Sequence, residues 1–196
     1  VVGMAAHGAK RLMAVVQKRA AKGLSRIGWC LVVFPLLGVL TCFYPQLPGN
    51  GRGPMQMALS DQMGVQTAAV VLVLKLAVIM GAVRAGAAGG LLTPSLAMGA
   101  LLATVLAGVW NLFLPPVAVG TVALLGGIAF LGTFMSMPLT AIALGIEFTQ
   151  VGHDLWVPVL LVSAGALLGL RVCARLDGTP APMPRPPAPD RVSVRP

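Results

Sequence analysis

The chain has 196 residues, of which 57% are hydrophobic and only 10% charged, and its formal net charge is +9. The mean hydropathy of +0.90 excludes an ordinary soluble domain, because a soluble domain of this size carries more charge. No Asp, Glu, Lys or Arg occurs over residues 85–146, and that run is far too long for one membrane crossing of about 20 residues. The sequence therefore predicts an all-α polytopic membrane protein.

The distribution of the positive charge argues against nucleic acid as a partner. The basic residues gather before the first apolar segment and after the last one. Cytoplasmic flanks of membrane helices carry such an excess of Lys and Arg. We therefore expect a multi-pass protein of the cell membrane, in a bacterium its inner membrane, with both termini cytoplasmic and the lipid bilayer, including anionic headgroups, as its surroundings.

The first predicted element is a basic, amphipathic helix over residues 7–26, which is expected to enter from the cytoplasm and to continue into the apolar segment 29–43. A loop over 46–54 precedes the later helices, which differ in length: 55–60, 65–83, 94–114, 117–134, 138–148 and 155–173. Short helices interrupted by Gly and Pro are typical of transporters with sites near the bilayer midplane. Three regions follow from this pattern: a basic entry region 1–27, a membrane domain 28–176, and a disordered Pro- and Arg-rich cytoplasmic tail 177–196.

The segment from Gly86 to Ser95 places a glycine-rich break and Pro94 inside the apolar run. Proline is favoured in the first turn of a helix, so a helix is expected to begin at Thr93 or Pro94. Non-helical backbone at membrane depth survives only where it is buried in protein or lines a polar cavity. A helix N-terminus offers N–H donors and a partial positive charge, so a small anion is the expected guest of that cavity.

Two ionisable residues lie within the apolar segments and are interpreted as structural. Lys75 is expected to face the bundle interior and to bond to carbonyls or a carboxylate, in preference to a direct transport role. Glu147 is expected to make a hydrogen bond at a helix end, in preference to a role in a proton relay.

Catalysis and cofactors have little support in the sequence. The three cysteines, Cys30, Cys42 and Cys173, are widely spaced and are interpreted as packing residues without metal-ligand spacing. No Ser, His and carboxylate constellation lies at membrane depth, so an enzyme is not expected, and neither is a metal or a cofactor. Pairs of small residues, including Gly99 with Ala103, Gly126-Gly127, and Gly165 with Gly169, predict close contacts between helices.

Three blocks of sequence carry a resemblance to a known family. Gly90-Leu91-Leu92-Thr93-Pro94 resembles the G-x-F-x-P signature of the CLC chloride channels and chloride/proton antiporters. The stretch from Ser136 to Thr149 is similar to the family's following P-L-T and E-x-T segment, and Lys75 stands where many members carry a lysine. The order and spacing of the blocks match from about residue 8 to residue 173.

The resemblance implies a CLC-like fold of tilted, broken helices arranged in two inverted repeats. It implies chloride transport by a voltage-gated-type channel or by a chloride/proton antiporter, with the backbone N–H groups of Leu91 and Leu92 on the anion. Gly90, Leu91, Leu92, Thr93 and Pro94 are thus the expected anion-binding residues. It also implies a homodimer formed through the late helices 138–148 and 155–169.

The sequence departs from the family pattern in two respects. The motifs of the N-terminal repeat, a G-S-G-I-P-like stretch and the G-(K/R)-E-G-P stretch with its gating glutamate, do not occur in it. The chain is therefore expected to be the C-terminal half, which needs an N-terminal CLC-like repeat for a complete pathway. The family's late tyrosine has no counterpart, because the only tyrosine is Tyr44. The alternative is a truncated, transport-inactive subunit that only assembles with other chains.

Overall fold

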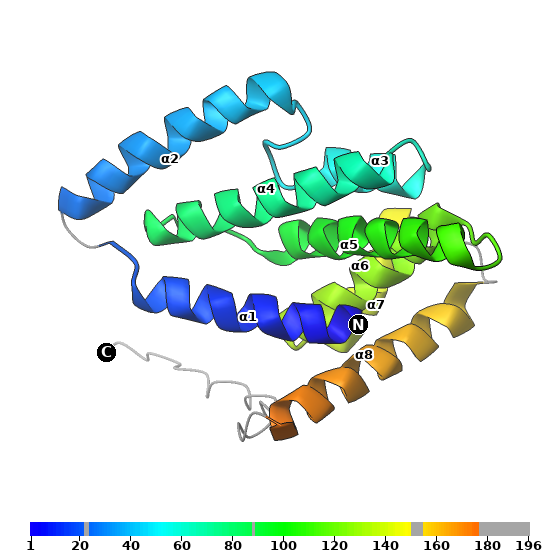
Figure 1. Ribbon diagram of the computed structural model, residues 1–196. Coiled ribbons are helices and arrows are strands. Elements are labelled where there is room, and N and C mark those ends of the chain that lie inside the picture. The colour runs from blue at the N-terminus through cyan, green and yellow to red at the C-terminus, as the bar shows by residue number, and fades with distance from the viewer. Residues whose placement is uncertain (22–23, 88, 150–154, 177–196) are drawn as a thin grey trace, which may run out of the picture.

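The computed structural model describes residues 1–21, 24–87, 89–149 and 155–176. The expected tail over 177–196 lies outside these residues. All the regular elements of the described chain are α-helices, and their order runs along the molecule as in Figure 1. They are α1 (Val2–Lys18), α2 (Leu24–Phe43), α3 (Arg52–Leu59), α4 (Val65–Arg84), α5 (Leu92–Phe113), α6 (Val119–Met135), α7 (Pro138–Thr149) and α8 (Trp156–Leu176).

The helices match the predicted segments closely, with one correction at the start of the chain. The prediction that one helix continues from 7–26 into the next segment is wrong, because α1 ends at Lys18 and α2 begins at Leu24. The chain leaves the helix at this point because the N–H of Ala21 pairs with the carbonyl of Arg84, 2.8 Å away, instead of with the preceding turn. The basic region is thus divided between two helices, and the second contacts α4.

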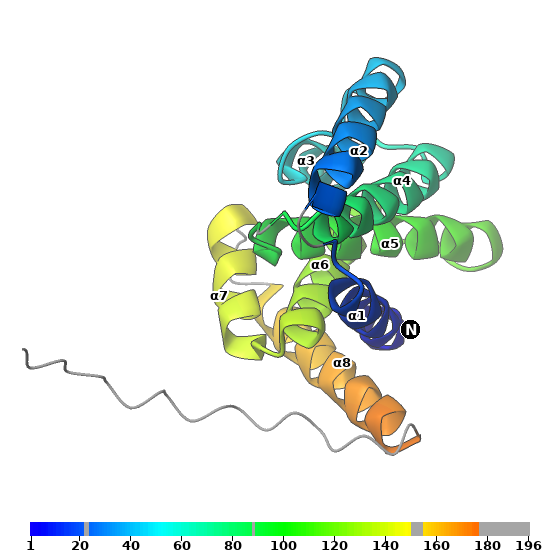
Figure 2. The same cartoon turned by 90° about the vertical axis from the view of Figure 1, so that its left-hand side faces the viewer.

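The centre of the molecule is the close pair formed by α5 and α6 (Figure 2). Gly99 and Gly126 allow this approach: a Cβ atom at Gly99 would lie 2.7 Å from the Gly126 carbonyl oxygen. The predicted contact at Gly165 and Gly169 is wrong within the described chain, since a Cβ atom at either position would meet nothing within 4 Å. Small residues therefore bring α5 and α6 together, whereas Gly165 and Gly169 of α8 have open space at their Cβ positions.

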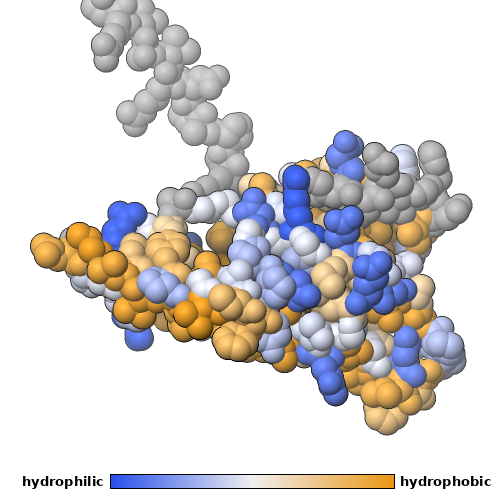
Figure 3. Space-filling model, turned by 90° about the horizontal axis from the view of Figure 1, so that it is seen from above, coloured by the Kyte–Doolittle hydropathy of each residue, from blue (hydrophilic) through white to orange (hydrophobic). Residues whose placement is uncertain are grey.

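Four helices of the described chain are long and apolar enough to cross a membrane, namely α2, α4, α5 and residues 156–173 of α8. Among the described helices, α2 contacts α4 alone, and it stands out from the bundle in Figures 1 and 2. Hydrophobic side chains cover much of the face seen in Figure 3. Large exposed apolar residues are expected where a surface faces lipid or another apolar surface and are unusual in a soluble protein.

Candidate functional site at the break between α4 and α5

The helix α4 ends in a turn that depends on Gly86. Gly86 has φ of +78°, and its N–H pairs with the carbonyl of Val83 while the N–H of Ala87 pairs with that of Ala82, each at 3.0 Å. These two bonds form the Schellman motif, in which a left-handed glycine closes a helix and satisfies its last carbonyls. The chain therefore leaves α4 abruptly and enters the glycine-rich segment.

The helix α5 begins at Leu92, one or two residues before the predicted start, with Leu91 as its N-cap and Pro94 in its first turn. The N–H of Ser95 pairs with the Leu91 carbonyl at 3.0 Å and thereby closes the first turn. The first N–H groups of an α-helix have no acceptor within the helix, so those of Leu92 and Thr93 remain available, while Pro94 has none. The positive end of the α5 dipole adds to these donors.

A pocket of about 360 Å³ lies in front of this helix start. The backbone segment that precedes α5 forms one wall, through Gly89, Gly90 and Leu91, together with Pro94. The rest of the lining comes from the region of the α1 end, from α4 and from the turn after it: Gln17, Ala20, Ile79, Ala82, Val83, Gly86 and Ala87. Three of the predicted anion-binding residues, Gly90, Leu91 and Pro94, thus line one pocket, whose walls are mainly apolar side chains and backbone.

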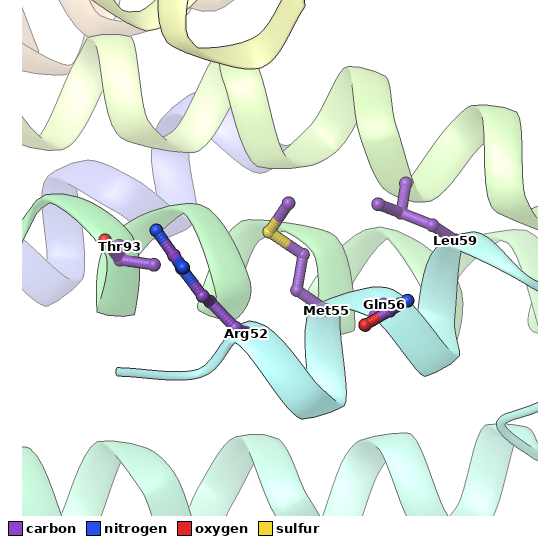
Figure 4. A pocket seen from close by; sticks show the side chains of 5 residues that line it. All are labelled: Arg52, Met55, Gln56, Leu59 and Thr93. Atoms are coloured by element: carbon purple, nitrogen blue, oxygen red, sulfur yellow. The ribbon is translucent and has the colours of Figure 1, made fainter. Parts of the chain in front are cut away.

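Thr93 lies on another pocket, of about 300 Å³, which is shared with α3. Figure 4 shows the Arg52 side chain extending from the start of α3 toward Thr93, with Met55, Gln56 and Leu59 farther along the same helix. The start of α5 therefore borders two pockets, and a guanidinium group flanks the second one. Leu92 is 39% exposed and lines neither pocket.

Lys75 lies in the interior, away from the lining of both pockets. Its side chain is 2% exposed, and Nζ donates to the carbonyls of Leu47 at 3.0 Å and Gly49 at 3.1 Å. The loop that leads to α3 is thereby bonded to the middle of α4. Gly51 leaves the space that this contact needs, since a Cβ atom there would lie 2.6 Å from the Ala97 Cβ and 3.1 Å from Cε of Lys75.

Glu147 lies near the end of α7, and its side chain is exposed. Its expected hydrogen bond at a helix end stays a prediction. Within the described ranges, no group of three or more His, Cys, Asp or Glu side chains is placed to hold a metal ion.

The sequence interpretation missed three arginines around the break. Arg52 flanks the pocket at Thr93, Arg26 bonds to the turn after α4, and Arg84 at the end of α4 bonds to the Arg19 carbonyl. Arg26 was interpreted only as part of a basic flank, because its partner is 60 residues away in the sequence. A basic residue at the end of an apolar helix gives no signal that separates a backbone contact from a lipid contact.

These features define a class of protein. The chain is a multi-pass, all-α membrane protein in which one helix begins at a glycine-rich break beside a pocket. A family model described as "Voltage gated chloride channel" matches residues 1–170. The chain belongs to that family.

Comparison with curated proteins finds several bacterial relatives. The H(+)/Cl(-) exchange transporter ClcA of Vibrio vulnificus (strain YJ016) is 26% identical over 140 residues, which cover 70% of this chain and 30% of that protein. The transporter of the same name from Vibrio campbellii is 27% identical over 147 residues, covering 74% and 31%. The one from Salmonella arizonae is 27% identical over 135 residues, covering 68% and 28%. This chain thus spans about 30% of the length of these relatives.

Replacing Lys75 with Met should destabilise the protein and loosen the loop before α3. The substitution keeps the apolar stem but leaves the carbonyls of Leu47 and Gly49 unpaired, and a buried unpaired group costs roughly 1–3 kcal/mol. Thermal unfolding in detergent should occur at a lower temperature, and trypsin should cleave faster after Arg52. Lys18→Met at an exposed position is the matched control; equal behaviour of the two variants would show that the Lys75 bonds contribute nothing.

Proposed function

We propose that this chain forms part of a transmembrane chloride pathway, in which the backbone N–H groups of Leu91 and Leu92 bind the anion at the start of α5. The observation that carries the proposal is the pocket in front of the break, whose wall is the backbone of Gly89, Gly90 and Leu91. Unpaired N–H donors in apolar surroundings cost several kcal/mol, and an anion in the pocket offsets that cost.

The electrostatics of the break favour an anion over a cation. The positive end of the α5 dipole lies beside the pocket that Leu91 and Pro94 line. Arg26 bonds to the turn after α4, and Arg84 ends the helix before that turn. The relatives are named H(+)/Cl(-) exchange transporters, which supports chloride as the anion. Gly90, Leu91, Leu92, Thr93 and Pro94 form the proposed binding segment, with Thr93 on its α3 side.

The test is the replacement of Gly90 with Val. A Cβ atom at Gly90 would meet nothing within 4 Å, and its φ is not in the left-handed region, so the fold accepts the new side chain. The added methyl groups enter the space beside the N–H donors, and chloride binding should be lost. Isothermal titration of the purified protein at its natural length measures binding, and liposome flux measures transport.

Gly38→Val is the matched control, because Gly38 also has open space around its Cβ position but lies on α2. It should leave chloride binding unchanged. Chloride binding that survives Gly90→Val would contradict the proposed site. A wild-type protein that neither binds nor transports chloride would favour the alternative, a transport-inactive subunit that assembles with other chains.

The proposal includes a homodimer formed through α7 and α8, with both termini cytoplasmic as the basic flanks favour. Exposed apolar residues form a stripe along α8, spaced by four or seven positions: Val157, Leu161, Leu168 and Val172, which are 57–68% exposed. Ala164 and Gly165 are also exposed on this helix and would let a second copy approach closely. The region 28–176 is the proposed membrane domain.

Cysteine cross-linking tests the dimer. In a background with Cys30, Cys42 and Cys173 replaced by Ser, Leu161→Cys should form a disulfide-linked dimer on oxidation in membranes, since a two-fold interface pairs a patch with its own copy. Leu36→Cys on α2, whose parent side chain is 56% exposed, is the control and should stay monomeric. A dimer that forms only through position 36 would place the interface on the opposite side of the molecule.

A further inference from the structure

Three consecutive carbonyl groups, at the end of α4 and in the turn after it, accept hydrogen bonds from Ala21, which follows α1, and from two residues in the first turns of α2. The Arg84 carbonyl accepts from the N–H of Ala21 at 2.8 Å. The Ala85 carbonyl accepts a weak bond from Sγ of Cys30 at 3.8 Å, and the Gly86 carbonyl accepts from Nη2 of Arg26 at 2.6 Å. All three acceptors of this turn are therefore satisfied by one distant segment of the chain.

The last residue of α4 also donates a hydrogen bond back to the chain that follows α1. Nη1 of Arg84 donates to the Arg19 carbonyl at 3.1 Å, and its guanidinium lies 4.7 Å from the centre of the Trp29 ring. A cation over an indole face is attracted by the ring electrons. The end of α4 is thus bonded to the chain after α1 and to the first turns of α2 through both backbone and side chains.

The conformation of Gly86 sets the direction of the hydrogen bond between its carbonyl and Arg26. Its left-handed φ of +78° directs its carbonyl at Arg26. A Cβ atom at Gly86 would lie 2.8 Å from Nε of Arg26, so the guanidinium occupies the space that any side chain at position 86 would need. Gly86 also lines the pocket in front of α5, as do Gln17 and Ala20 from the region of the α1 end.

We propose that Arg26 is a positioning residue for the anion site, because its bond to the Gly86 carbonyl anchors the upstream end of the glycine-rich segment. This inference rests on the proposed chloride site. The segment is held by α5 on its downstream side, where the first helical turn fixes Leu91 and Leu92. With both ends held, the N–H groups keep one direction, and the anion binds without first ordering the backbone.

The experiment compares Arg26→Gln, Arg26→Lys and Lys18→Gln in the protein at its natural length, purified in detergent. Arg26 is exposed, so its replacement leaves the core intact, and Lys18→Gln removes the same charge from an exposed site near the end of α1. Chloride affinity is measured by isothermal titration, and the mobility of residues 84–92 by hydrogen–deuterium exchange.

Arg26→Gln should weaken chloride binding roughly tenfold, in line with the loss of a hydrogen bond to a charged group, and should speed exchange over residues 84–92. Arg26→Lys keeps a charged donor and should recover part of both effects. Lys18→Gln should match the wild type in both.

Two results would overturn the positioning role while leaving the chloride site in place. One is equal affinity in Arg26→Gln and Lys18→Gln, where Gly90→Val still abolishes binding. The other is wild-type exchange in Arg26→Gln. A wild-type protein without chloride binding would instead overturn the proposed site, and the positioning role with it.

Discussion

The structure depends on how backbone groups are satisfied where the chain stops being helical inside an apolar molecule. Each helix end leaves donors or acceptors without a partner in the helix, and in a membrane water is not available to bond them. At the end of α4, the acceptors are satisfied by a Schellman turn and by three donors from Ala21 and the first turns of α2. At the start of α5, the first N–H groups have no acceptor within the helix, and Leu91, Thr93 and Pro94 line pockets beside it. This difference separates a structural helix end from a candidate binding site.

Lys and Arg side chains donate hydrogen bonds to backbone carbonyls in this molecule. Lys75 bonds two carbonyls of the loop that leads to α3, Arg26 bonds a carbonyl of the turn after α4, and Arg84 bonds the carbonyl of Arg19 after α1. Each bond joins segments that are far apart in the sequence, so the loop before α3 is held by a side chain of α4, and the turn after α4 is held by a side chain of α2. The start of α5 follows the turn bonded by Arg26 and shares a pocket with the start of α3, so its position follows from long-range contacts as well as from its own sequence.

Much of this arrangement could be predicted from local sequence. Hydropathy and the Gly and Pro breaks identify the helices within a few residues, and Pro94 after the glycines identifies the start of α5. Local pattern could not predict contacts such as Arg26 with Gly86 or Lys75 with Leu47, because nothing in a single sequence pairs residues so far apart. It also missed the end of α1 at Lys18, since the bond that redirects the chain comes from Arg84.

The most direct test of the account is to locate a heavy halide in a crystal of the protein at its natural length, grown with bromide in place of chloride. Bromide scatters anomalously, so its position can be assigned without reference to the protein density. The account predicts an anomalous peak in the pocket before α5, within hydrogen-bonding reach of the N–H groups of Leu91 and Leu92. A well-diffracting crystal whose bromide peaks all lie elsewhere would contradict the proposal that this helix start binds the transported anion.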